Sequence, residues 1–241
     1  MARQRKPKIC YLCGQVIEGK PADPDMAGSR DHVPPKQFYP PEIRNQPGIN
    51  LHTEWTHKKC NGAYKLDEEY FYHRLYPLVV NANTSMANVV FRDLRRRAKQ
   101  PQTRVLVSEL LRTGTTVTKG GIHLPPGIVR FEIDKYRMQR VALKVARGVL
   151  YAETRRYFPL DNAVDIRLCE SPDDVPEGYR FIPEGTGPKG AYPAVFSYIH
   201  VEWADVHALL MCYWGAFVFC TAFQDPAKNQ RDDVDTTQRA S

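Results

Sequence analysis

Four soft metal ligands stand in two short pairs in the first part of the chain. Cys10 and Cys13 form a C-x2-C pair followed directly by glycine, and His57 and Cys60 form an H-x2-C pair further along. Thiolates and imidazoles in this grouping are the ligands of closed, tetrahedral zinc sites. The spacing therefore predicts one structural zinc ion held by Cys10, Cys13, His57 and Cys60. His52, shortly before His57, is the competing choice for the histidine ligand.

Residues suited to acid–base chemistry and to hard cations lie between and beside these pairs. Asp31 and His32 adjoin in the stretch DHVPPK, Asn50 follows later, and Asn61 comes directly after Cys60. A neutral imidazole takes a proton from water near neutral pH, and carboxylate and amide oxygens are ligands for hard divalent cations. If zinc ties Cys60 to the cysteine turn, Asn61 starts a helix that faces Asp31 and His32. The alternative is a turn aspartate beside a surface histidine.

The order of these motifs resembles the HNH endonuclease family, whose core is a ββα fold around one catalytic metal ion. The elements are C-x2-C, D-H-V-x-P, N-L and H-x2-C-N-x3-K, and they cover residues 10–65. The segments KLDEEYFYHRL and VARGVLY resemble, less specifically, sequences found beside this core in bacterial and phage proteins. Two positions depart from the commonest pattern, because Asn61 stands at the final family position and His57 replaces a zinc cysteine.

The resemblance implies a metal-dependent endonuclease that hydrolyses DNA phosphodiester bonds. In such a site His32 is the general base, and Asp31 and Asn61 hold one Mg²⁺ or Mn²⁺. Asn50 stands at the middle position of the family's three-residue motif, and the resemblance implies that its side chain braces the loop around the histidine. The runner-up hypothesis is a non-catalytic, zinc-stabilised subunit that binds nucleic acid. A third is an antiphage defence nuclease that a protein partner or ligand activates through the C-terminal part.

Basic side chains near the motif are candidates for contacts with DNA phosphates. The chain has a net charge of +7 and a pI of about 9.1, which suits a polyanionic partner without proving one. Lys65 lies one helical turn after Asn61, and Glu69 one turn further, either paired with Lys65 or as a third metal ligand. The predicted phosphate contacts, each with a solvated surface position as the alternative, are Lys36, Lys65, Arg95, Arg96 and Arg97.

Composition and periodicity indicate an α+β fold for the 241 residues. We expect an HNH domain over 1–83 that starts with a basic arm, an α+β domain over 84–224, and a disordered tail over 225–241. The second domain would regulate activity, bind DNA or form oligomers. Helical patterns cover three segments between 66 and 112 and a long segment over 134–157 that Asp134 caps. Strands are expected over 128–133, 194–202 and 216–223.

Nothing in the sequence predicts contact with a membrane. The start MARQRKPKICYLCG lacks the apolar stretch of a secretory signal, and the apolar run 208–223 is shorter than the roughly 20 residues of a membrane span. Its central glycine is a place for a helix to end, so we interpret the run as buried core. We expect three further cysteines to pack in the hydrophobic core: Cys169, Cys212 and Cys220. A cytoplasmic protein is predicted, and double-strand cleavage from one single-metal site would favour a homodimer.

Overall fold

The computed structural model describes residues 7–79, 84–126, 129–169, 172–180, 182 and 186–227. Most of the basic arm expected over 1–8, and residues 228–241 of the expected disordered tail, lie outside the described residues. The expected start of that tail at residue 225 is corrected, because Asp225 is buried against the sheet. The chain combines helices with two antiparallel sheets, which confirms the predicted α+β class at the level of helix and strand content.

The N-terminal part contains a two-stranded sheet followed directly by helices. β1 (Gly28–His32) pairs with β2 (Thr53–His57), and β2 leads without a break into α2 (Lys58–Gly62) and then α3 (Lys65–Leu75). Because Gly28 pairs with His57, the start of β1 lies beside the start of α2, and the end of β1 lies beside the start of β2. The connections hold short helices: η1 (Pro24–Met26), η2 (Lys36–Phe38), α1 (Pro41–Arg44) and η3 (Tyr76–Leu78).

The C-terminal part is a five-stranded antiparallel sheet in the order β3-β7-β6-β5-β4. Its strands are β3 (Ala163–Cys169), β4 (Lys189–Tyr192), β5 (Phe196–Trp203), β6 (Val206–Tyr213) and β7 (Phe217–Gln224). In β6 buried residues alternate with half-buried ones, which is the pattern of a sheet with one face on the core. Short elements before β4 are η4 (Leu160–Asn162), η5 (Pro172–Asp174) and α8 (Glu177–Arg180).

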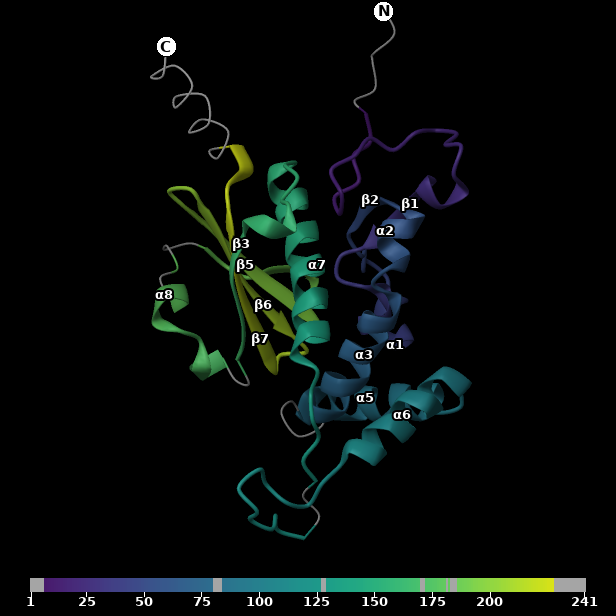
Figure 1. The fold of residues 1–241 in the computed structure, drawn as a ribbon, viewed down its shortest axis with the longest axis vertical. Helices are drawn as coiled ribbons and strands as arrows, with labels where there is room; N and C mark the ends of the chain where they lie inside the picture. The colour runs from purple at the N-terminus through teal and green to yellow at the C-terminus, as the bar shows by residue number, and fades with distance from the viewer. Residues whose placement is uncertain are drawn as a thin grey trace, which may run out of the picture.

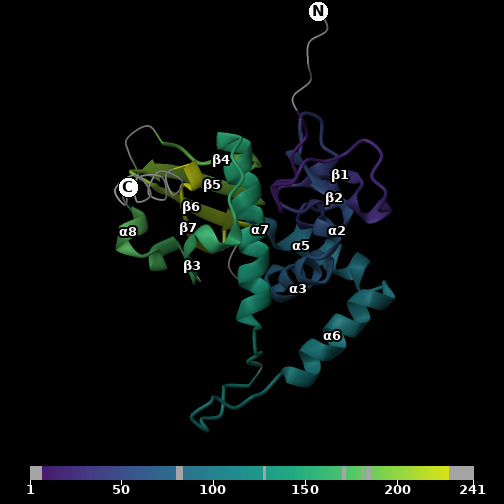
Figure 2. The same cartoon turned by 45° about the horizontal axis from the view of Figure 1, so that its top comes forward.

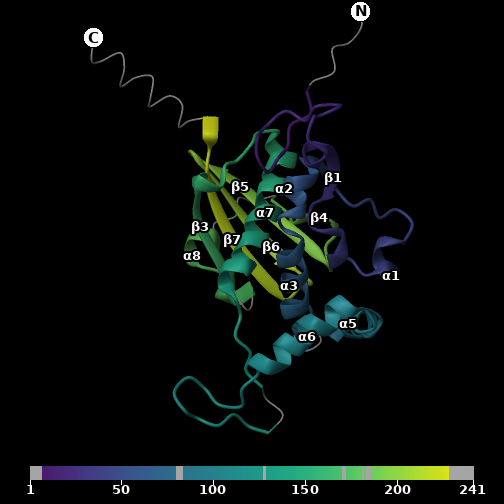
Figure 3. The same cartoon turned by 45° about the vertical axis from the view of Figure 1, so that its right-hand side comes forward.

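The long helix α7 (Lys135–Thr154) lies between this sheet and the N-terminal elements, as Figures 1 and 2 show from two directions. It contacts α3 on one side and β3, β6 and β7 on the other. The carboxylate of Asp134 accepts a hydrogen bond from the backbone N–H of Arg137 at 3.2 Å and caps the helix as predicted. In Figure 3 α7 crosses the front of the sheet, and α5 (Thr84–Arg97) and α6 (Pro101–Thr113) lie near one end of α3.

One hydrophobic core runs through both parts of the chain. The ring of Phe71 on α3 lies 5.2 Å from that of Tyr213, and Phe38 lies 5.5 Å from Trp214. The indole N–H of Trp214 donates a hydrogen bond to the carbonyl of Phe38 at 3.2 Å. The expected boundary between residues 83 and 84 therefore does not divide the core, since aromatic residues from before and after it pack together.

The strands expected over 194–202 and 216–223 are confirmed as β5 and β7. The apolar run 208–223 forms most of β6 and β7 with a turn around its glycine, so no helix ends there. The strand expected over 128–133 is corrected. Over 129–133 no strand forms, and only an isolated bridge joins Arg130 to Thr115. A short apolar segment becomes a strand only when a neighbouring strand pairs with it, and this segment has no such neighbour among the described residues. Among the described residues, no helix has both the length and the apolar character to cross a membrane.

Candidate functional site

The four predicted soft ligands come together at the junction of β2 and α2. One ligand atom from each of Cys10, Cys13, His57 and Cys60 lies within 4.8 Å of the others. The Sγ of Cys13 is 3.3 Å from Nδ1 of His57, and the Sγ of Cys60 is 3.8 Å from the same nitrogen. The predicted group is therefore confirmed as a cluster able to hold a metal ion. His52 is not part of it, because its Nε2 lies 2.7 Å from Glu54 Oε1.

Local backbone structure brings each pair of ligands to one point. Gly14 has φ of 75°, a left-handed conformation that glycine adopts without strain, and its N–H donates to the carbonyl of Cys10 at 2.8 Å. This turn directs both cysteines of the first pair to one side. His57 precedes α2 and Cys60 lies within it, so one helical turn aligns the second pair.

The electrostatics of the cluster suit a cation. Burial, followed by the neighbouring sulfurs of Cys10 and Cys13, raises the pKa of the Cys60 thiol to about 12. Several thiolates are therefore held together only when a positive ion compensates their charge, as a coordinated dication does. The donor set of three sulfurs and one imidazole fits a closed four-ligand site of the zinc type.

A second cluster joins Asp31 and Asn61, the two residues assigned to the catalytic metal. Both accept hydrogen bonds from the ammonium group of Lys144 on α7, at 2.8 Å to Asp31 Oδ2 and 2.8 Å to Asn61 Oδ1. The carboxylate of Glu68 on α3 pairs with the same ammonium. The Tyr11 hydroxyl also donates to Asp31 Oδ2 at 2.6 Å. Three acceptor oxygens from β1, α2 and α3 thus converge on one positive charge.

Close packing of α7 against Val33, the residue directly after β1, places Lys144 at this point. A Cβ on Gly148 would lie 2.6 Å from a methyl carbon of Val33, so only glycine permits this approach of the helix. Lys144 lies one turn earlier on the same helix, and its side chain is only 1% exposed. Burial opposes its charge, but the carboxylates of Asp31 and Glu68 outweigh that cost and raise the pKa of Lys144. The ammonium therefore stays charged.

Donor chemistry decides whether the predicted Mg²⁺ or Mn²⁺ fits here. Two carboxylates and an amide oxygen are the hard ligands that such a cation takes. If a divalent cation bound beside the ammonium, three positive charges would face the two negative charges of the carboxylates. If the cation replaced the ammonium, its two positive charges would balance the two carboxylates. The three side chains are ligands of the type that a divalent cation takes, but such a cation would have to replace the Lys144 ammonium at their common position.

His32, the predicted general base, is half-buried at the last position of β1. Its side chain has no hydrogen-bond partner within the described part of the chain, and it is next in sequence to Asp31. Burial, and then the positive charge of Lys36, lower the pKa of His32, while Asp31 acts in the opposite direction. The imidazole is therefore neutral at pH 7 and available to accept a proton.

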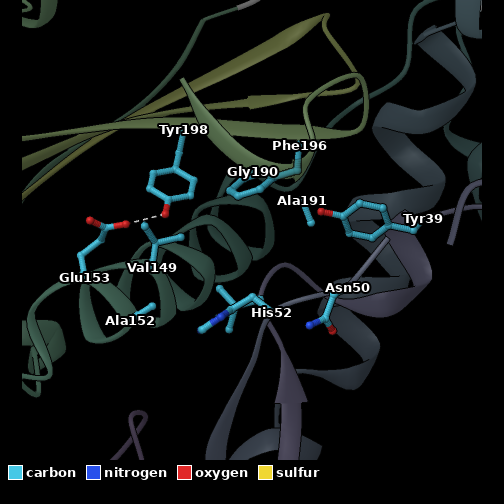
Figure 4. A pocket seen from close by; sticks show the side chains of 11 residues that line it. Tyr39, Asn50, His52, Val149, Ala152, Glu153, Gly190, Ala191, Phe196 and Tyr198 are labelled. Atoms are coloured by element: carbon cyan, nitrogen blue, oxygen red, sulfur yellow. Dashed lines mark hydrogen bonds between the residues drawn. The ribbon is translucent and has the colours of Figure 1, made fainter. Parts of the chain in front are cut away.

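Asn50, the remaining predicted site residue, is exposed and lines a pocket of about 390 Å³. Figure 4 shows this pocket between the loop that carries Asn50 and His52, helix α7, and strands β4 and β5. The Tyr198 hydroxyl donates to Glu153 at 2.6 Å on its wall. Neither the residues of the Lys144 cluster nor His32 line this pocket.

The basic side chains predicted to meet phosphates fall into two groups. Three are exposed and free to reach a ligand: Lys36, Lys65 and Arg95. Arg97 is used inside the fold, because it donates to Asp93 at 2.9 Å and to the carbonyl of Gln37 at 2.6 Å, with a side chain only 12% exposed. Arg96 also pairs with Asp93 but keeps about half of its side chain exposed.

Sequence reasoning missed Glu68, Lys144 and Tyr11. The sequence pattern points to Glu69, whereas the structure places its neighbour Glu68 at the Lys144 ammonium, because a turn separates α2 from α3 and shifts the helical register. For Lys144 one signal existed, since a single lysine inside the apolar run VALKVA is unusual on the buried face of an amphipathic helix. No family model matches the chain, and neither the curated proteins nor the solved structures include a significant match.

Proposed function

We propose that the chain is an HNH-type endonuclease that hydrolyses DNA phosphodiester bonds, with zinc as its structural ion and Mg²⁺ or Mn²⁺ as its catalytic ion. The observation that carries this function is the convergence of Asp31 from β1 and Asn61 from α2 on one cation position. Strand, strand and helix follow in the order that the resemblance implies, and the cysteine cluster adjoins Asn61 directly. The net charge of +7 suits a polyanionic substrate.

His32 takes the proton of the attacking water in this scheme. The water oxygen bonds to phosphorus as the bond from phosphorus to the leaving 3′-oxygen breaks. Asp31, Asn61 and Glu68 would hold a divalent cation, which would supply positive charge to the phosphate and to the leaving oxygen. Lys36 and Lys65 are the exposed cations that contact neighbouring phosphates. We assign the protein to the cytoplasm, where reduced cysteines hold zinc rather than form disulfides.

A specific observation favours a second candidate function, a non-catalytic module that binds nucleic acid. The buried Lys144 ammonium already satisfies Asp31, Asn61 and Glu68, and a permanent ion pair of this kind needs no metal. The two functions differ in whether purified protein cleaves plasmid DNA in the presence of Mg²⁺ or Mn²⁺. Cleavage supports the nuclease, whereas binding without cleavage supports the module.

Asn61→Ala is expected to reduce cleavage of supercoiled plasmid roughly 10²-fold or more. The reason is that the divalent cation proposed to bind Asn61 stabilises the charge of the transition state by several kcal/mol. Zinc content should not change, since Asn61 supplies no sulfur or imidazole to the cysteine cluster. DNA affinity should also be largely kept, because lysine and arginine contacts to phosphates carry it. Cleavage, zinc content and salt-dependent binding are measured on the same preparation.

The matched control is Asn88→Ala, which removes an exposed asparagine on α5. It should cleave like the wild type. Normal cleavage by Asn61→Ala would remove Asn61 from the site and, with it, the main support for the proposed function.

Lys144→Met tests the exchange between ammonium and metal. Without a divalent cation the variant should be destabilised by about 3–5 kcal/mol, because two buried carboxylates lose their partner. Saturating Mn²⁺ should then raise its melting temperature by about 5–10 °C, and that of the wild type by clearly less. Lys135→Met, at an exposed lysine on the same helix, is the control and should respond like the wild type. Equal responses to Mn²⁺ in wild type and Lys144→Met would show that the ammonium does not compete.

A further inference from the structure

A second group of metal-ligating side chains lies at one end of the five-stranded sheet. Glu202 is near the end of β5, His207 near the start of β6, and Asp225 directly after β7, and Figure 1 shows these three strands side by side. One ligand atom from each residue lies within 4.8 Å of the other two. Glu202 and His207 are directly opposite in the strand register, so their side chains leave the same face of the sheet.

Asp225 is held beside this pair by the backbone. Its N–H donates to the carbonyl of Asp205 at 2.7 Å, which extends the pairing of β7 with β6 by one residue. Its Oδ1 accepts from the N–H of Ala227 at 2.9 Å, which leaves Oδ2 facing the cluster. The side chain is almost fully buried, and Oδ2 also accepts a hydrogen bond from Arg156.

The His207 ring is the observation that points to a ligand. The residue is 0% exposed, and its Nε2 is a buried nitrogen without a hydrogen-bond partner. The nearest carboxylate oxygen, Oδ2 of Asp225, lies 3.6 Å away. A hydrogen bond between nitrogen and oxygen spans about 2.7–3.2 Å, so Nε2 makes no hydrogen bond to Asp225 across this gap.

The same gap is close to the separation of two ligands on one metal ion. Zinc binds imidazole nitrogen and carboxylate oxygen at about 2.0–2.2 Å, and a tetrahedral angle then places the two ligand atoms about 3.3 Å apart. The other ring nitrogen of His207 lies 3.0 Å from Nε2 of His200. A metal-binding histidine usually makes such a contact through its second nitrogen, which fixes the orientation of the ring.

We propose that Glu202, His207 and Asp225 bind a zinc ion. One imidazole and two carboxylates balance its charge, and three protein ligands leave a coordination position for water. Arg156 donates to Asp225 Oδ2 at 2.8 Å and is half-exposed, so it holds the carboxylate from the solvent side or withdraws when the ion binds. The ion ties together the ends of β5, β6 and β7. This site is separate from the cysteine cluster and from the Lys144 cluster, and it does not depend on nuclease activity.

Calorimetric titration with zinc chloride tests the site on full-length protein whose cysteine cluster is already filled with zinc. We expect the wild type to bind one further zinc ion per chain. Glu202→Gln should weaken that binding at least about 10-fold, the lower end of what a disturbed metal site loses. Glu202 is exposed, so this variant should fold normally, whereas His207→Gln, at a buried position, should abolish the binding but is more disruptive.

Two controls separate this site from other zinc-binding groups. Glu132→Gln removes an exposed carboxylate elsewhere, and Asn61→Ala removes a ligand of the Lys144 cluster. Both should bind the further ion as the wild type does. The assignment is overturned if the wild type takes up no further zinc, or if Glu202→Gln binds it with unchanged affinity.

Discussion

Replacement of His32 by alanine is expected to lower the rate of DNA cleavage about 10²–10⁴-fold, which is the usual contribution of a positioned general base. Folding and zinc content should stay the same, because the His32 side chain has no hydrogen-bond partner among the described residues and lies outside the cysteine cluster. Cleavage is measured on supercoiled plasmid with Mg²⁺ and Mn²⁺, next to zinc content and melting temperature.

The pH dependence of DNA cleavage by the wild type tests the role of His32 as general base independently. Burial and Lys36 lower the pKa of His32, so its neutral form persists to a pH below the ordinary value for histidine. Activity should therefore be full above this lowered pKa and fall as the pH drops through it, because the protonated imidazole accepts no proton. The residual cleavage rate of His32→Ala should not show this fall at low pH.

His123→Ala is the matched control, since it removes an exposed histidine far along the sequence from the motif. It should cleave normally. Activity of His32→Ala within a few-fold of the wild type would exclude His32 as the base, even if Asn61 proves essential.

Replacement of Cys60 by serine is expected to release the structural zinc and unfold the N-terminal part. Binding of structural zinc contributes about 10–16 kcal/mol in small zinc domains, and a whole protein is stable by only about 5–15 kcal/mol. The cluster joins the cysteine turn to the β2–α2 junction, so its loss removes the tie that positions Asn61. Metal analysis and thermal unfolding measure the effect, and the wild type should retain this zinc ion through dialysis.

Two variants control for the choice of ligands. Cys212→Ser changes a cysteine on β6 outside the cluster and should keep the ion. His52→Ala should keep it too, because His52 pairs with Glu54 instead. A Cys60→Ser protein that is folded, free of zinc and active would contradict the four-ligand site, and loss of zinc from His52→Ala would show that the wrong histidine was chosen.

The sequence by itself determined the features that depend on short spacing. A C-x2-C pair followed by Gly14 is a turn, and H-x2-C spans one helical turn, so each pair of ligands converges through local backbone geometry alone. The same holds for α7, whose cap at Asp134 and apolar periodicity are local signals. The strands around 196–203 and 217–224 were also predictable, because β-branched and aromatic residues are concentrated there.

Only the tertiary structure decided which residues meet across long distances in the sequence. Lys144 is 83 residues from Asn61, and no local pattern relates them. Their contact depends on the packing of α7 against Val33, directly after β1, which the close approach at Gly148 permits. The group of Glu202, His207 and Asp225 likewise exists only because three strands end at the same place in the sheet. Spacing along the chain sets local geometry, whereas the burial of apolar faces against one another decides which charged groups share a site.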